Sequence, residues 1–315
     1  MFFEGPEKKL EIFVKDSIDL LSKDDLYWQG LVERAGAKIL SCVLNENIKA
    51  YLLSESSLFV FKDRVLLITC GQTRLVKSAE YLLNDLGQQN ISFVSYQRKN
   101  ELFPVEQKST FLQDAAVLKK LVQGEILRFG AEGEHHISLF HYSDDFLAPQ
   151  NDSTIEILMH GIPEVLFDTF VPENKEAINF FRKSSVWQKY FADYLVDDFL
   201  FSPRGYSLNG ILEQNYFSVH ITPQKVGSYV SFESNAFDQI SQNEILKAIL
   251  ELFQPDSCDF FAYHPNSRPS DLEIPKSYLL RKRVAKDLQS GYRVSFDHLF
   301  SKPDGQYKKA KVIEL

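Results

Sequence analysis

The 315-residue sequence predicts a β-rich α+β fold in which two packed sheets carry helices on their outer sides. It contains 26 Phe and 14 Tyr against 14 Gly and 12 Pro, and aromatic residues favour strands over flexible linkers. Short runs of alternating apolar and polar residues recur along the chain, which indicates antiparallel hairpins. Helices that cover one face of such a sheet leave the other face in need of an apolar partner. A second sheet would provide that partner.

Apolar residues at strand or helix spacing place the individual elements. In the first half, strands are expected over residues 2–14, 39–43, 49–60, 65–70, 91–96, 125–129, 137–142 and 154–159, and helices over residues 26–36, 75–86 and 111–122. In the second half, strands are expected over residues 198–201, 207–212, 216–222, 229–232, 259–263, 278–280 and 292–296, and a helix over residues 243–253. The two halves share one rhythm of elements, which suggests an internal duplication.

Charge and composition exclude several function classes. The net charge is −8 and no long run of Lys or Arg occurs, which argues against a nucleic-acid partner. The sequence has neither an apolar run of 18 residues nor a basic-then-apolar start, so we expect a cytoplasmic protein that neither spans a membrane nor is secreted.

Cysteine and histidine spacing gives no metal site. Cys42, Cys70 and Cys258 are odd in number and lack metal-ligand spacing, which favours a reducing compartment. The adjacent pair His135 and His136 would face opposite sides of a strand, so the two rings would diverge.

Residues 51–60 are an apolar run of strand character that is interrupted by Ser54, Glu55, Ser56 and Ser57. Serine clusters usually mark loops, and a loop between two strands is the simplest interpretation. The alternative is that these polar residues serve chemistry, because Ser and Glu have little preference for strands.

The hairpin that follows this interruption would place one serine opposite one cysteine, depending on the length of its loop. A three-residue loop at 62–64 would pair Phe61 with Val65 and, further along, Ser56 with Cys70. A two-residue loop would shift this pairing by one residue.

A second hairpin, turning at Glu213 and Gln214, would pair Ser207 with His220. A serine that faces a histidine is a proton-handling pair. A Ser-His-Asp hydrolase would use such a pair, but no G-x-S-x-G motif surrounds any serine, which disfavours a hydrolase.

Residues 50–60, AYLLSESSLFV, resemble the self-processing segment of eukaryotic-type S-adenosylmethionine decarboxylases, which are pyruvoyl enzymes of polyamine synthesis. Other blocks resemble the family in the same order: residues 2–8 (FFEGPEK), 69–71 (TCG), 154–159 (TIEILM), 205–210 (GYSLNG), 220–223 (HITP) and 228–233 (SYVSFE). The resemblance therefore covers residues 2–233, and the remaining residues match only in pattern.

The resemblance implies a single domain, residues 1–315, with a four-layer α/β/β/α sandwich and a site between its two sheets. It implies autocatalytic cleavage between Glu55 and Ser56 into chains 1–55 and 56–315, with Ser56 converted to the pyruvoyl cofactor. Ser207 and His220 would assist that processing. Cys70 would then protonate the substrate Cα after decarboxylation.

Further roles follow from the same resemblance. Glu4 and Glu7 match acidic residues needed for activity and processing, and Phe3 and Phe201 match rings that sandwich adenine. Glu55 is expected beside the substrate. Many members carry a Glu that binds both ribose hydroxyls where this chain has Gln224, and an amide makes weaker hydrogen bonds there than a carboxylate.

A group of buried polar side chains matches the putrescine site of animal and fungal members. Its residues are Glu11, Asp152, Thr154, Glu156 and Glu233. Buried carboxylates need a cation among them because unpaired buried charge is costly. Animal members supply a Lys where this chain has Ile68, so the cation here is expected to be a diamine or an Arg from elsewhere.

The expected function is conversion of S-adenosylmethionine to decarboxylated S-adenosylmethionine, an aminopropyl donor for spermidine and spermine synthesis, and CO₂, through a Schiff base to the pyruvoyl group. A homodimer of the cleaved units is a possible assembly. Two alternatives stay open: a pyruvoyl decarboxylase with another amino-acid substrate, suggested by Gln224, and a catalytically dead paralogue that regulates an active partner. Retention of Ser56, Cys70, Ser207 and His220 argues against the dead paralogue.

Overall fold

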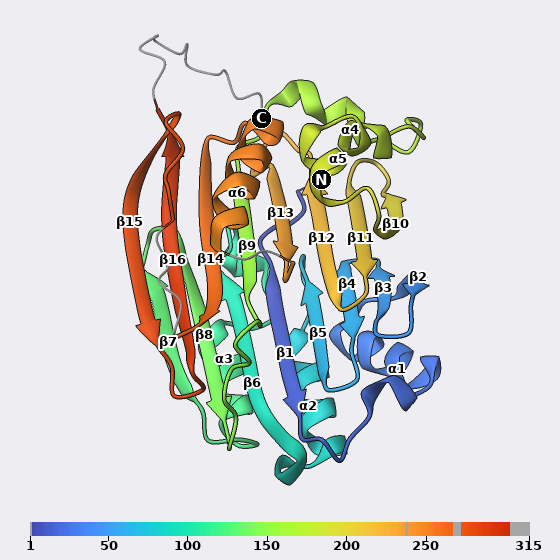
Figure 1. The fold of residues 1–315 in the computed structure, drawn as a ribbon, viewed down its shortest axis with the longest axis vertical. Coiled ribbons are helices and arrows are strands. Elements are labelled where there is room, and N and C mark those ends of the chain that lie inside the picture. Colours follow the sequence, from blue (N-terminus) through green and yellow to red (C-terminus); the bar gives the residue numbers. More distant parts are fainter. Residues whose placement is uncertain (1, 237–238, 267–271, 303–315) are drawn as a thin grey trace.

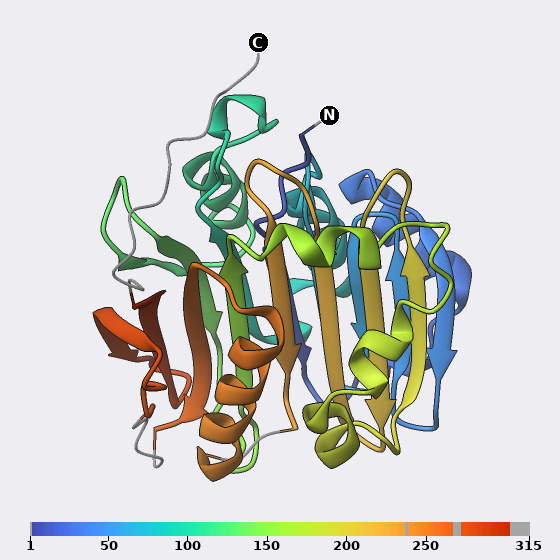
Figure 2. The same cartoon turned by 90° about the horizontal axis from the view of Figure 1, so that it is seen from above.

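Two eight-stranded antiparallel sheets lie face to face, with helices on the outer side of each (Figures 1 and 2). The computed structural model describes residues 2–236, 239–266 and 272–302. Figure 2 shows the helices of the first half of the chain on one side of the paired sheets and those of the second half on the other. The predicted four-layer α/β/β/α sandwich is confirmed.

The first sheet has the strand order β2-β3-β4-β5-β1-β6-β8-β7. Its strands are β1 (Lys8–Val14), β2 (Ile39–Leu44), β3 (Lys49–Leu53), β4 (Ser56–Val60), β5 (Arg64–Thr69), β6 (Ile91–Lys99), β7 (Glu125–Gly130) and β8 (His136–Ser143). The helices that accompany it are α1 (Asp25–Ala35), α2 (Leu75–Leu86) and α3 (Phe111–Leu118).

The second sheet has the order β10-β11-β12-β13-β9-β14-β16-β15. Its strands are β9 (Thr154–His160), β10 (Leu195–Leu200), β11 (Tyr206–Leu212), β12 (Asn215–Thr222), β13 (Tyr229–Ser234), β14 (Ser257–Pro265), β15 (Tyr278–Asp287) and β16 (Tyr292–Ser301). Its helices are α4 (Ile178–Arg182), α5 (Ser185–Tyr190) and α6 (Gln239–Phe253). Adding eight to each strand number in the order of the first sheet gives the strand order of the second sheet, as the predicted duplication requires.

Most predicted elements are present, and the differences have local causes. Residues 2–7 do not continue β1, because Pro6 lacks the N–H that a strand ladder needs. The predicted strand 49–60 is two strands, β3 and β4, separated by Ser54 and Glu55. The short helices α4 and α5 were not predicted. At the start of α5, the Ser184 side chain accepts a hydrogen bond from the Trp187 N–H and so caps the helix.

Four apolar clusters hold the layers together. Trp28 of α1 and Leu82 of α2 pack on the outer face of the first sheet, and α6 packs on the outer face of the second. Between the sheets, one cluster gathers around Phe93 and Phe261 and another around Phe59. Side chains on the central strands between these clusters include the buried polar groups described below. Within the described residues, no helix is long and apolar enough to cross a membrane.

Candidate active site

The hairpin that joins β4 to β5 has a two-residue loop, Lys62 and Asp63. The Phe61 N–H donates to the Arg64 carbonyl oxygen at 2.8 Å and closes this tighter turn. Of the two loop lengths that the sequence allowed, the structure has the two-residue loop, so the expected pairing of Ser56 with Cys70 is wrong. Ser56 pairs with Thr69, one residue away from the predicted partner Cys70.

Cys70 lies opposite Glu55 instead. The Cys70 backbone N–H donates to the Glu55 carbonyl oxygen at 3.0 Å, and the Cys70 thiol donates to the same oxygen at 3.3 Å. This carbonyl belongs to the Glu55–Ser56 peptide bond. Two donors aimed at one carbonyl oxygen are the arrangement that stabilises an oxyanion. Burial raises the pKa of the Cys70 thiol well above its ordinary value, so the thiol keeps the proton that it donates.

Ser56 is held in an unfavourable conformation. Its φ is +133°, a region that L-residues rarely adopt and that costs about 1–3 kcal/mol. Its buried Oγ has no hydrogen-bond partner within the described part of the chain. A hydroxyl without a partner is available for attack on the neighbouring Glu55 carbonyl carbon. Strain and an unsatisfied hydroxyl thus coincide at the predicted cleavage site.

A serine and histidine pair lies across the sheet interface from this bond. Ser207 on β11 pairs with His220 on β12, as predicted, and Ser207 Oγ is 2.8 Å from His220 Nδ1. His220 Nε2 is 3.2 Å from Ser57 Oγ, which donates to Asn209 Oδ1 at 2.6 Å. Burial lowers the pKa of His220 to about 3, so its ring is neutral at pH 7 and can accept a proton.

Ser57 and Asn209 are functional candidates that the sequence reasoning missed. Asn209 follows Ser207 by two positions on one strand, so the alternation of strand side chains already places the two on the same face. The contact from β4 to β11 crosses between the sheets. No pattern in the sequence indicates this contact between Ser57 and Asn209.

One pocket of about 440 Å³ gathers most of the predicted site. Its lining includes Phe3, Glu55, Ser56, Cys70, Phe201, Ser207, His220 and Gln224. These residues come from the N-terminal segment, from the ends of β4 and β5, and from β11, β12 and the loops beside them. Residues more than 200 positions apart in the sequence therefore meet in one cavity.

Glu4 and Glu7 are buried beside this pocket and are not among its lining residues. The Glu4 carboxylate accepts the N–H groups of Leu102 and Phe103, each at 2.9 Å, and so anchors the chain after β6. Glu7 accepts a hydrogen bond from Ser231 Oγ at 2.5 Å. Burial raises the pKa of Glu7 to about 8.

Gln224 has a structural partner that the sequence did not reveal. Its Oε1 accepts the Phe3 N–H at 3.0 Å, and its Nε2 donates to the Phe3 carbonyl oxygen at 2.7 Å. An amide can make both bonds, whereas a carboxylate cannot donate the second. Gln224 therefore fixes the segment that carries the Phe3 ring.

The turn after Cys70 is fixed by Lys8 and needs a glycine. Lys8 Nζ donates to the Gly71 and Thr73 carbonyl oxygens at 2.8 and 3.1 Å. Gly71 has a φ of +63°, and a Cβ there would lie 3.0 Å from the Phe3 ring. Gly71 thus allows the Phe3 ring to approach the loop that carries the thiol.

The buried acidic group contains its own cations. Lys9 Nζ is 2.9 Å from Glu156 Oε1 and 2.9 Å from Glu233 Oε1. Burial alone would lower the pKa of Lys9, but these two carboxylates outweigh it and raise the pKa above its ordinary value. Lys9 was not foreseen, although its position two residues before Glu11 on β1 places both on one strand face.

Arg64 provides the other cation. Its Nη1 is 3.1 Å from Asp152 Oδ1 and 3.4 Å from Glu11 Oε1, which agrees with the expected arginine from elsewhere. Burial raises the pKa of Glu11 to about 7 against the opposing effect of Arg64. Thr154 is buried on β9, two residues before Glu156.

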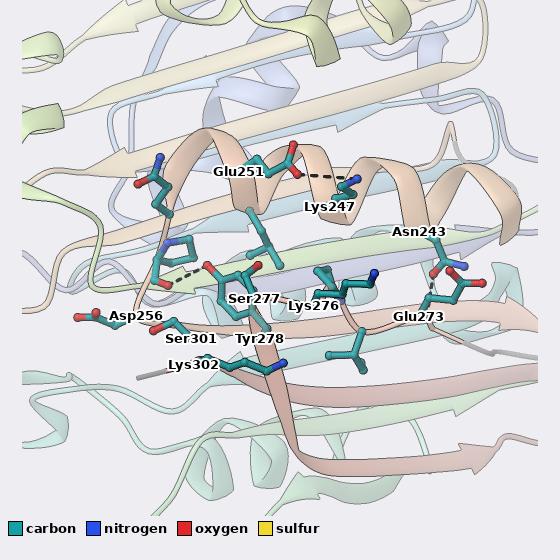
Figure 3. Close-up of a pocket in the computed structure, with 15 residues that line it drawn as sticks. Asn243, Lys247, Glu251, Asp256, Glu273, Lys276, Ser277, Tyr278, Ser301 and Lys302 are labelled. Carbon is teal, nitrogen blue, oxygen red and sulfur yellow. Dashed lines mark hydrogen bonds and ion pairs between the residues drawn. The ribbon is translucent and has the colours of Figure 1, made fainter. Parts of the chain in front are cut away.

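A second hollow lies between α6 and the start of β15 (Figure 3). Its side chains pair with their neighbours: Lys247 with Glu251 at 3.9 Å, and Asn243 Oδ1 with the Glu273 N–H at 3.0 Å. Tyr278 Oη donates to the Pro255 carbonyl oxygen at 2.9 Å. None of the predicted site residues lines this hollow, whereas most of them line the first pocket, so we place the candidate site there.

The pH dependence of stability is one testable consequence of the Glu7 environment. The pKa of this carboxyl rises from an ordinary 4.5 to about 8 on folding, so the folded chain binds its proton more tightly. The resulting stabilisation is full below pH 4.5 and is lost as the pH rises through 8. Glu7→Gln stays neutral, so its free energy of unfolding should fall less over this window, by up to about 1.4 kcal/mol per pH unit.

Denaturant unfolding at several pH values measures this slope. Glu125→Gln, at an exposed position of β7, is the matched control and should follow the wild-type chain. Equal slopes for Glu7→Gln and the wild type would show that Glu7 is ionised in the folded state.

Comparison with known proteins agrees with this geometry. The family model for adenosylmethionine decarboxylase matches residues 1–299. The chain is 34% identical to the S-adenosylmethionine decarboxylase proenzyme of Trypanosoma cruzi, over 93% of this chain and 87% of the relative. It is 30% identical to the proenzyme of the same name from Dictyostelium discoideum, over 93% and 84%.

A solved structure supports the fold. The crystal structure of the Trypanosoma brucei AdoMetDC-delta26 monomer superposes with a TM-score of 0.61 and covers 78% of this chain and 99% of that one. At 18% identity, this likeness concerns the fold alone.

Proposed function

The chain belongs to the adenosylmethionine decarboxylase family, and from this premise we propose that it is a self-processing decarboxylase that makes its own pyruvoyl cofactor from Ser56. Its substrate is S-adenosylmethionine, and the product would serve as the aminopropyl donor in polyamine synthesis. The observation that carries the proposal is the Glu55 carbonyl, which accepts two hydrogen bonds from Cys70 beside a strained Ser56.

Processing would begin with attack of Ser56 Oγ on the Glu55 carbonyl carbon. The negative charge that develops on the carbonyl oxygen is stabilised by the Cys70 N–H and thiol. Departure of the Ser56 nitrogen converts the peptide bond to an ester. The backbone strain at Ser56 favours this step, because the strained peptide is consumed in it.

The neutral His220 ring would then take the Ser56 α-proton, with Ser207 holding the ring through Nδ1. Elimination breaks the bond between Ser56 Cβ and Oγ and releases residues 1–55 with a new carboxyl end at Glu55. Water then displaces ammonia from the remaining residue. This leaves a pyruvoyl group at the start of residues 56–315, the division of the single domain that the sequence predicts.

In turnover, the pyruvoyl group would supply a ketone for the substrate α-amine and an electron sink for the loss of CO₂. The buried Cys70 thiol would donate a proton to the substrate Cα. Phe3 and Phe201 line the pocket, and stacking of adenine on such a ring is worth about 1–3 kcal/mol. The bonds from Gln224 to Phe3 give that amide a positioning role, so its presence does not require another substrate.

Replacement of Ser56 tests the proposed function. Ser56→Ala should give one uncleaved chain without decarboxylase activity, because the attacking hydroxyl is gone. Ser54→Ala is the matched control. The Ser54 hydroxyl contacts the Lys38 N–H and the Glu55 carboxylate, so its loss should leave cleavage largely intact.

Intact mass spectrometry and release of labelled CO₂ from S-adenosylmethionine measure both outcomes. Cleavage of Ser56→Ala at the same position, or activity in its uncleaved chain, would contradict the proposal.

We also propose that Lys9 and Arg64 take the place of a diamine in the acidic group. Lys9 bridges Glu156 and Glu233 at 2.9 Å, so no carboxylate in that pair lacks a cation. Our proposal is therefore that these side chains neutralise the carboxylates internally, in place of the expected activation by putrescine. Homodimerisation of the cleaved units stays a prediction.

A Lys9 substitution separates these two proposals. The decarboxylase activity of the wild-type protein should stay constant across a putrescine titration. Lys9→Ala leaves buried carboxylates unpaired and should lose about 3–5 kcal/mol of stability, part of which putrescine should restore. Lys15→Ala, which breaks a pair with Asp144 that is 37–44% exposed, is the control and should change the stability little, because solvent screens the pair. Activation of the wild type by putrescine would contradict internal neutralisation.

A further inference from the structure

Three histidines and a lysine surround the buried carboxylate of Asp259 on β14. Asp259 Oδ2 is 3.1 Å from His135 Nδ1, 3.8 Å from His160 Nε2 and 3.0 Å from Lys99 Nζ. Asp259 Oδ1 is 2.7 Å from His298 Nδ1. The mechanism proposed above uses none of these side chains.

The cluster joins the two sheets. His135 precedes β8 and Lys99 ends β6 in the first sheet, whereas His160 ends β9 and His298 lies on β16 in the second. The sequence expectation that His135 and His136 diverge is consistent with their contacts. His136 Nδ1 is 2.9 Å from the Glu134 carbonyl oxygen, while His135 is directed at Asp259.

The spacing of the donor atoms fits a small transition-metal ion. The ligand atoms of His135, His160 and Asp259 all lie within 4.8 Å of one another. Bonds of about 2.0–2.2 Å in a tetrahedral zinc site place neighbouring ligand atoms about 3.4 Å apart. The separations of 3.1 and 3.8 Å from Asp259 Oδ2 lie on either side of that value.

A second observation singles out His160. Its Nε2 atom is buried and has no hydrogen-bond partner in the described part of the chain. The side chain is 13% exposed, and its ring packs against Tyr229 with 5.1 Å between centroids. An unsatisfied buried nitrogen costs about 1–3 kcal/mol, a cost that a metal bond would remove.

We propose that His135, His160 and Asp259 bind one divalent ion of the zinc class. Water would complete a tetrahedral shell, and His298 would orient the carboxylate through its other oxygen, as outer partners of metal ligands do. His135 is 33% exposed, which gives the ion a route from solvent. Because the ligands come from both sheets, the ion would clamp the sheets together.

Lys99 competes with the ion for Asp259 Oδ2. Its ammonium lies 3.0 Å from that oxygen, so metal entry must displace it. Lys99 Nζ also donates to the Asn100 side chain and, at 3.5 Å, to the His136 carbonyl oxygen, and it could keep these bonds after leaving Asp259. The proposal therefore predicts opposite effects for two kinds of substitution. Loss of a ligand weakens binding, and loss of Lys99 strengthens it.

Titration of the metal-free purified protein, with residues 1–55 and 56–315 both present, with zinc chloride, by calorimetry and by equilibrium dialysis with metal analysis, tests the site. We expect one ion per chain and a rise in the thermal unfolding midpoint. His135→Ala should weaken binding at least 100-fold, whereas His136→Ala, the matched control from the same dipeptide, should leave it unchanged. Lys99→Met should tighten binding about tenfold.

Three outcomes would overturn the proposal. These are absence of stoichiometric binding to the wild-type chain, equal affinity of His135→Ala and His136→Ala, and weaker or unchanged binding by Lys99→Met. Circular dichroism of each variant before titration establishes that it is folded, and His135, the most exposed ligand, is the substitution least disruptive to the core.

Discussion

The two-residue turn at Lys62 and Asp63 sets the register on which the candidate active site depends. It pairs Ser56 with Thr69 and places Cys70 opposite Glu55. The thiol therefore faces the Glu55 carbonyl, the proposed point of attack, while the Ser56 hydroxyl has no hydrogen-bond partner among the described residues. A shift of one residue would move each side chain to the other face of its strand and separate these groups.

The sandwich brings the remaining groups to this bond because its two sheets have the same topology and lie face to face. β11 and β12 carry Asn209 and His220 to a position across from β4, where Ser57 contacts both. Such an arrangement requires polar groups inside an apolar interface. The charged groups among them are paired where Lys9 and Arg64 neutralise carboxylates on the central strands. Breaking such a buried pair is costly, although the pair itself adds little net stability.

Local patterns were sufficient to predict most of the fold and part of the site. Alternation located the strands, α2 was predicted with its observed ends, and the turn at Glu213 gave the correct pairing of Ser207 with His220. The β4–β5 register was missed, because loops of two and of three residues are both compatible with residues 61–65. Lys9 and Asn209 each lie two positions from a recognised residue, so same-face alternation would have found them.

Contacts between the sheets were beyond local reasoning. The side chains around Asp259 come from β6, β9, β16 and the residue before β8, and no spacing in the sequence brings these segments together. The same holds for the bonds between Gln224 and Phe3, which are 221 positions apart. Both depend on how two sheets are stacked, which is a property of the whole chain.

The central claim is that Cys70 polarises the bond between Glu55 and Ser56, and the rate of self-cleavage after synthesis tests it most directly. Cys70→Ala removes the thiol donor and keeps the backbone N–H, so cleavage should continue but slow by about 100- to 1,000-fold. Cys258→Ala, a buried cysteine on β14 outside the site, should cleave at the wild-type rate. Wild-type cleavage kinetics in Cys70→Ala would contradict the account.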